Sequence, residues 1–74
     1  MDNKSLETFL MLAKEKSFSR TAERMNITQP AISKRIANLE AELNTQLIDR
    51  IGKQISLSHS GIILQQHASN LLKS

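Results

Sequence analysis

The sequence predicts a small, mainly α-helical domain with one short β-hairpin. Two observations carry this prediction. Along most of the 74-residue chain, apolar residues recur at the three- and four-residue spacing of amphipathic helices. Around one glycine, Gly52, the spacing changes to the alternation of a strand. The composition agrees, because 39% of the residues are hydrophobic and none is cysteine, so a single apolar core must hold the fold.

The first predicted helix has Ser5 as its expected N-cap. Its apolar stripe is Leu6, Phe9, Leu10 and Ala13. The Ser17-Phe18-Ser19 segment interrupts the pattern, and Ser19 is the expected N-cap of a short second helix that opens at Arg20. Asn26, which tolerates the left-handed conformation, is expected to end that helix.

A third helix is predicted directly after the three-residue step Asn26-Ile27-Thr28. Thr28 is its expected cap, and Gln29-Pro30 stands in its first turn, where the missing N–H of proline costs nothing. The helix is expected to end near Asn44. The residues expected to face the core are Ile32, Ile36, Leu39 and Leu43.

The pattern after Asn44 indicates two short strands and a last helix. Leu47, Ile48 and Ile51 precede the turn signal Gly52-Lys53, and Ile55 and Leu57 then alternate with polar residues. Ser58 can cap the last helix, so we expect a domain over residues 1–58 and the start of a linker helix over 59–74. The apolar stripe of this helix predicts either a face that pairs with a second copy, which we favour, or a cap over the small core; its residues are Leu64, Ala68, Leu71 and Leu72.

Two helices joined by a three-residue step, with a hairpin behind them, form a winged helix-turn-helix. Such a fold leaves the first turns of its second motif helix exposed, where they suit the major groove of double-stranded DNA. Gln29 can pair with adenine, Lys34 can reach guanine or a phosphate, and Ser33 can bond to either. The outward residues are expected to be Gln29, Pro30, Ser33, Lys34 and Ala37.

The charge distribution is compatible with DNA binding, although a scattered solvated surface is the alternative. The net charge is +3. Residues 20–35 carry four basic side chains against one acidic one, and Arg50 and Lys53 add two more near the tip of the hairpin. Arg35 could contact a phosphate or be solvated, and for Arg20 and Arg24 a structural role is slightly favoured because Glu23 lies beside them.

Several classes of function are disfavoured by the residues. Two aromatic residues are too few to stack single-stranded nucleic acid. His59 and His67 lack partners at metal-ligand spacing, and there is no phosphate loop or nucleophile elbow, so we expect no metal, no cofactor and no enzyme activity. The apolar run Phe9 to Ala13 is too short for secretion or a membrane span, so a cytoplasmic protein is expected.

The run SFSRTAERMNITQPAISKRIANLE, with LNTQLIDR and ISLSHSG after it, resembles the amino-terminal winged helix-turn-helix domain of LysR-type transcriptional regulators over essentially the whole chain. The resemblance implies sequence-specific binding to an interrupted DNA dyad as a homodimer paired through the linker helix. It also implies a two-lobed domain beyond these residues that senses a small-molecule effector. The residues it implies at the DNA, together with those inferred from position and charge, are Thr28, Gln29, Pro30, Ser33, Lys34, Arg35, Arg50 and Lys53.

The sequence departs from the family pattern at two places. Ile48 stands where phenylalanine is usual, which leaves the packing of the wing open, and His59-Ser60 replaces the usual residues before Gly61. A second hypothesis is a protein-interaction module on the same scaffold. It predicts large apolar groups on the outward side of residues 28–37, where this chain has Gln, Ser and Lys.

Overall fold

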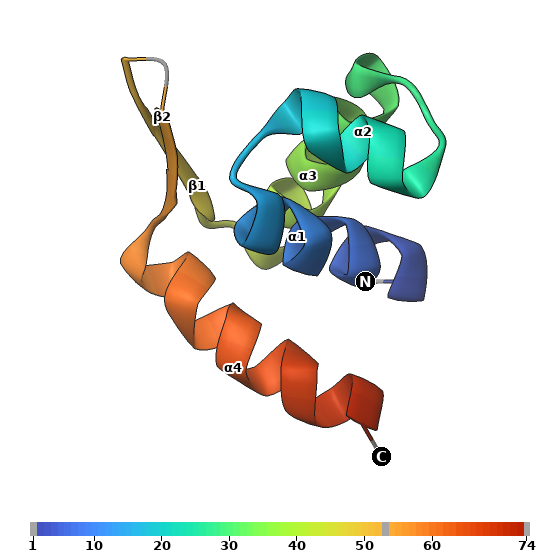
Figure 1. Ribbon diagram of the computed structural model, residues 1–74. Coiled ribbons are helices and arrows are strands. Elements are labelled where there is room, and N and C mark those ends of the chain that lie inside the picture. Colours follow the sequence, from blue (N-terminus) through green and yellow to red (C-terminus); the bar gives the residue numbers. More distant parts are fainter. Residues whose placement is uncertain (1, 53, 74) are drawn as a thin grey trace.

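The computed structural model describes residues 2–52 and 54–73, and the side chains of residues 69 and 71–73 lie outside the described part. The elements follow in the order α1 (Asn3–Glu15), α2 (Phe18–Met25), α3 (Gln29–Leu43), β1 (Ile48–Ile51), β2 (Gln54–Leu57) and α4 (His59–Lys73) (Figure 1). The three-helix unit, the hairpin and the final helix confirm the predicted winged helix-turn-helix. In the described part of the chain, no helix has both the length and the apolar character needed to cross a membrane.

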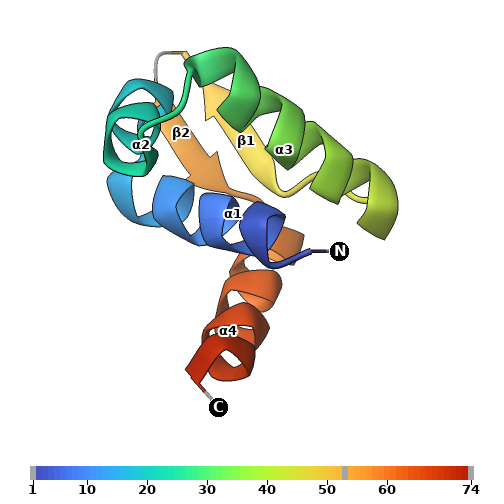
Figure 2. The ribbon, with the colours of Figure 1, turned by 90° about the vertical axis from the view of Figure 1, so that its right-hand side faces the viewer.

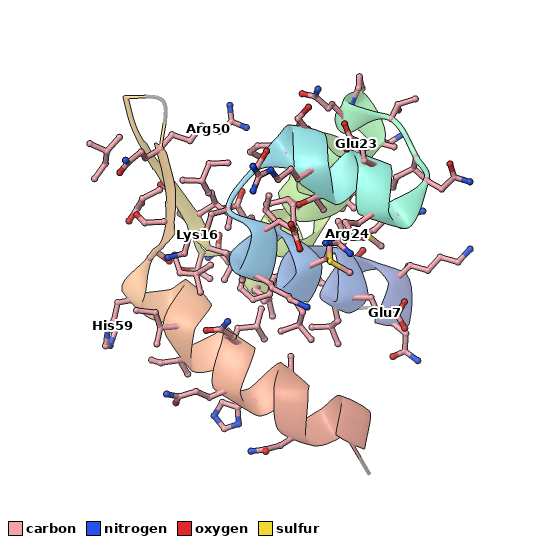
Figure 3. The ribbon with its side chains drawn as sticks, viewed as in Figure 1. Glu7, Lys16, Glu23, Arg24, Arg50 and His59 are labelled. Carbon is pink, nitrogen blue, oxygen red and sulfur yellow. The ribbon has the colours of Figure 1, made fainter. Side chains whose placement is uncertain are left out.

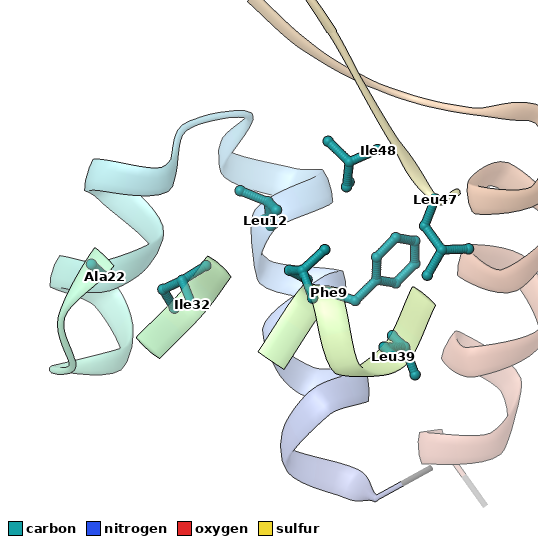
Figure 4. Packing of buried hydrophobic residues seen from close by; sticks show 8 residues of the cluster. Phe9, Leu12, Ala22, Ile32, Leu39, Leu47 and Ile48 are labelled. Atoms are coloured by element: carbon teal, nitrogen blue, oxygen red, sulfur yellow. The ribbon is translucent and has the colours of Figure 1, made fainter. Parts of the chain in front are cut away.

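The core lies where α1, α2 and α3 meet, and the base of the hairpin closes it (Figure 4). Phe9 and Ile32 are fully buried, and the predicted core positions Leu6, Ile36 and Leu39 are buried too. Leu12, which was not assigned to the stripe, is also fully buried because it stands one helical turn after Phe9.

Leu43 was expected in the core, and that prediction is wrong. Its side chain is 37% exposed, because it lies in the last turn of α3, directly before the C-cap Asn44. The buried stripe of α3 therefore ends at Leu39.

Two predicted helix starts are also wrong. The N-cap of α1 is Asp2, whose Oδ1 accepts from the Ser5 backbone N–H at 2.8 Å, while Ser5 is itself buried in the first turn. The hydrogen bond from that backbone N–H holds the pKa of Asp2 below its ordinary value of 3.8. The N-cap of α2 is Ser17, whose Oγ accepts from the Arg20 N–H at 3.2 Å.

The helix ends at Asn26 and Asn44 and the cap at Thr28 are confirmed. Both asparagines have positive φ, 58° and 53°, and Thr28 Oγ1 accepts from the Ala31 N–H at 3.3 Å. Lys16 adopts the same left-handed conformation after α1, with φ 55°.

The hairpin extends to one side of the helices (Figure 1). Its antiparallel register pairs Ile48 with Leu57 and Arg50 with Ile55. Gly52, directly after β1, has φ 64°, a conformation that glycine adopts without a steric penalty. Ile55 and Leu57 pack against the core, and the side chains between and before them are exposed, so the predicted alternation is confirmed.

Helix α4 leaves the base of the hairpin and runs past α1 (Figures 1 and 2). Ser58 caps it as predicted, because its Oγ accepts from the Gly61 N–H at 3.0 Å. The backbone of Gly61 is so close to β1 that a Cβ there would overlap the carbonyl oxygen of Leu47. The start of α4 therefore lies directly against Leu47, the residue that precedes β1.

Candidate nucleic-acid interface

The step between α2 and α3 is a rigid turn. The N–H of Asn26 bonds back to the carbonyls of Ala22 and Glu23, and the N–H of Ile27 reaches the Ala22 carbonyl at 3.0 Å. The Ile27 side chain packs against the core, as expected for a residue that fills the corner of the motif. These bonds fix the angle at which α3 starts.

The faces of α3 divide as the sequence predicts. Ile32, Ile36 and Leu39 are buried, whereas the outward side chains are exposed: Gln29, Pro30, Ser33, Lys34 and Ala37. The first turns of α3 therefore present small, polar and basic groups to solvent. This is the surface that a major-groove reading helix requires.

The first two residues at the start of α3 are partly engaged within the protein. Thr28 is exposed, but its hydroxyl oxygen already accepts the Ala31 N–H. The side-chain Nε2 of Gln29 donates to Ser19 Oγ at 3.4 Å, which orients the amide across the top of α2.

Arg35 makes a contact within the protein, whereas the sequence suggested either a phosphate contact or a solvated side chain. Its guanidinium Nη1 donates to Thr8 Oγ1 at 3.2 Å, and Thr8 is fully buried on α1. The side chain of Arg35 is half-buried, so it joins α3 to α1. A phosphate contact by Arg35 stays a prediction.

Arg50 lies on the hairpin and turns toward the helices (Figure 3). Its guanidinium carbon is 4.4 Å from the centroid of the Phe18 ring, a cation–π arrangement. Phe18 is half-buried and packs against the core. Lys53 lies outside the described residues.

Glu40 and Gln46, for which the sequence predicts no role, hold the base of the hairpin. Glu40 Oε2 accepts from the backbone N–H groups of Leu47 at 2.7 Å and Ile48 at 3.2 Å. Gln46 Nε2 donates to the Ile48 carbonyl at 2.9 Å and to the Asp49 carboxylate at 3.2 Å. For Glu40 the sequence offers one signal, its place as the last residue of the run that resembles the family.

An open groove of about 700 Å³ separates α3 from β1. Ser33, Ala37 and Glu40 line its α3 side, and Ile48 and Arg50 line the other, with Phe18 between them. The groove thus joins the exposed face of α3 to the hairpin arginine in one continuous surface.

The remaining arginines of the helix-turn-helix lie on α2. Arg24 is exposed, and its Nε is 3.8 Å from Oε2 of Glu15, whose side chain is only 11% exposed; the pair supports the structural role slightly favoured for Arg24. Within residues 2–52 and 54–73 there is no group of three or more metal-ligating side chains.

Of the apolar stripe predicted on α4, the structure describes the side chains of two residues, Leu64 and Ala68. Ala68 is fully buried and Leu64 packs against the core of its own chain, as the cap alternative predicts, and the pairing face over these residues stays a prediction. Leu71 and Leu72 lie in α4, but their side chains are outside the described part. Among the described side chains of α4, the large apolar ones that are exposed are Ile62 at 46% and Ile63 at 45%.

Residues 3–62 match the model of the bacterial regulatory helix-turn-helix proteins of the lysR family. This chain belongs to the LysR family. Among curated relatives, an uncharacterized HTH-type transcriptional regulator of Azotobacter vinelandii is 44% identical over 97% of this chain and 50% of its own length. XapR of Escherichia coli, also an HTH-type transcriptional regulator, is 42% identical over 96% of this chain and 24% of its own length.

Solved LysR-family structures share the fold closely. The BenM DNA-binding domain in complex with catB site 1 DNA superposes with a TM-score of 0.94 at 34% identity, over 99% of this chain and 81% of that chain. DarR of Vibrio fischeri in complex with DNA gives 0.93 at 45% identity, over 99% of this chain and 25% of that chain. This chain thus spans half or less of the length of the curated relatives it matches, which are named as regulators and not as enzymes.

Proposed function

We propose that this chain is the DNA-binding domain of a bacterial transcription regulator and binds double-stranded DNA sequence-specifically, with the first turns of α3 in the major groove. The observation that carries the proposal is the division of α3. One face is fully committed to the core, and the other exposes only small, polar and basic groups at a protruding helix start. The likeness to BenM and DarR, both solved with DNA, supports the same assignment.

Each proposed contact follows from the chemistry of its side chain. Gln29, Ser33 and Lys34 face base edges, with Pro30 against a thymine methyl group. Thr28 and Arg35 are proposed phosphate contacts, and Arg50 and Lys53 hold the backbone or the minor groove from the hairpin. A good bidentate base contact discriminates by about 1–3 kcal/mol, whereas phosphate contacts add affinity for every duplex.

The whole regulator is proposed to act as a homodimer on an interrupted dyad, in the cytoplasm where its DNA lies. Residues 59–74 would form the start of a linker helix through which two copies pair. The exposed Ile62 and Ile63 give α4 apolar groups that a second copy can cover. A small-molecule effector would act only through a further domain of the longer regulator, after the linker helix.

The test is a selection of duplexes that bind this chain from a random-sequence pool. An enriched inverted repeat with fixed spacing is expected, because two-fold protein symmetry is mirrored in the site. Salt-sensitive binding without enrichment would contradict specific reading. The absence of any binding would favour the protein-interaction module instead.

The binding of single variants distinguishes side chains that recognise bases from side chains that contact phosphates. Gln29→Ala should relax the preference at one base pair of each half-site, and Lys34→Ala should weaken the selected site. Lys14→Ala is the matched control, because it removes one exposed lysine from α1, away from the proposed interface. Equal losses for Lys34→Ala and Lys14→Ala would show that only net charge matters.

A further inference from the structure

The ring of Phe18 contacts the guanidinium of Arg50 on the hairpin. We propose that Phe18 is a positioning residue for DNA binding: its ring keeps the Arg50 guanidinium over the groove between α3 and β1, ready to meet the duplex. The inference rests on the proposed function, since it concerns how the same surface engages DNA. It adds a residue that would not itself touch a base or a phosphate.

Phe18 is fixed by the start of α2. It directly follows the cap Ser17, whose carbonyl accepts from both the N–H and the hydroxyl of Thr21, at 3.0 and 2.7 Å. Thr21 is fully buried, and the Phe18 ring packs against the core. The ring is therefore a rigid platform on the helix-turn-helix itself.

Arg50 is fixed only through its backbone and this ring. It pairs with Ile55 across the hairpin, and Ile55 packs against the core. In the described part of the chain no carboxylate pairs with Arg50, and the Phe18 ring at 4.4 Å is its one side-chain partner. The guanidinium is held in place while its charge is left free for an anion.

The stacked pair stands between two hollows. It borders the groove of about 700 Å³ beside α3 and a second one of about 310 Å³ that Gly52 and Gln54 line near the tip of the hairpin. Without the ring, a long arginine side chain on an exposed strand samples many rotamers, and the binding-competent fraction falls. The Phe18 ring therefore holds the Arg50 guanidinium beside the groove between α3 and β1.

A double-mutant cycle on this chain tests the inference, with the affinity for a selected duplex as the readout. An exposed cation–π contact is expected to contribute about two- to fivefold, so Phe18→Leu should weaken binding by that factor. Phe18→Tyr, which keeps the ring, should bind like the wild type. In an Arg50→Ala background, Phe18→Leu should have no further effect.

A second readout does not involve DNA. In the NMR spectrum of the free protein, the Arg50 side-chain protons should carry a ring-current shift that Phe18→Leu removes and Phe18→Tyr keeps. Thermal unfolding of each variant shows whether the fold survives the substitution. If Phe18→Leu unfolds the chain, the spectrum and the affinity of Phe18→Tyr still test the pair.

The outcomes separate this inference from the proposed function. If Arg50→Ala weakens binding but Phe18→Leu binds equally well or more tightly, the ring does not position the arginine and the inference is wrong. Additive losses in the cycle would overturn it as well. If the wild-type chain binds no duplex, the proposed function itself has failed, and the ring-current shift then reports only on the free protein.

Discussion

Replacing Glu40 by alanine should release the base of the hairpin from α3. In the structure one carboxylate oxygen accepts two backbone N–H groups, from Leu47 at 2.7 Å and from Ile48 at 3.2 Å. Leu47 and Ile48 are buried, at 1% and 6% exposure, so water does not readily replace the lost acceptor. Leaving a buried donor unsatisfied costs about 1–3 kcal/mol.

With two donors affected and one bond much longer than the other, we expect Glu40→Ala to lower the free energy of unfolding by about 2–4 kcal/mol. For a domain of this size, 1 kcal/mol corresponds to about 4–8 °C in Tm, so even the lower value predicts a loss of about 8–16 °C. Glu40→Gln keeps an accepting oxygen without the charge and should lose less.

Urea and thermal unfolding followed by circular dichroism measure the effect, and amide hydrogen exchange at Leu47 and Ile48 locates it. Glu7→Ala is the matched control, because Glu7 is exposed on α1 and the same substitution there should stay within about 0.5 kcal/mol of wild type. If Glu40→Ala and Glu7→Ala were equally stable, the hydrogen bonds to the hairpin would contribute nothing and the reasoning would be refuted.

Three further predictions concern other junctions. Gly61→Ala should destabilise the fold by about 1–3 kcal/mol in urea unfolding, because its Cβ overlaps the Leu47 carbonyl oxygen; wild-type stability would contradict that packing. Lys16→Gly should raise stability by about 0.5–1 kcal/mol, since Lys16 has φ 55°, and an unchanged Tm would count against it. Asp2→Ala should be less stable than wild type at pH 7. Because the pKa of Asp2 lies below 3.8 when folded, the difference should shrink as pH falls through that lowered pKa; a difference of constant size would contradict this, and the difference between Asp2→Asn and Asp2→Ala, neither of which titrates there, should not change with pH.

The parts of the fold that depend on a few neighbouring residues could be predicted. Thr28, Asn26 and Asn44 mark helix ends because their side chains or conformations act within four positions. Where several nearby residues can cap, the local pattern does not decide between them, and the expected caps Ser5 and Ser19 were wrong. Ser5 is buried inside the first turn of α1, so Asp2 caps instead, and Phe18 packs against the core, so α2 starts at Phe18.

The part of the candidate site that could be predicted is the part formed by a single helix, α3. The exposed face of α3 is a matter of periodicity, and Ile32 and Ile36 lie where the period puts them. The bond from Arg35 to Thr8 and the stack of Arg50 on Phe18 join different elements. No local pattern encodes such contacts, because they depend on how the helices and the hairpin are packed.

Leu47 is the residue at which α3, the hairpin and α4 meet. Its N–H is held by Glu40 of α3, its carbonyl accepts the Ser58 N–H at 2.9 Å just before α4, and its side chain is 1% exposed. Gly61 of α4 lies against that same carbonyl. A change in the direction of α4 therefore cannot be confined to α4: it must strain the Leu47 peptide, which carries the hairpin on one side and is bonded to α3 on the other.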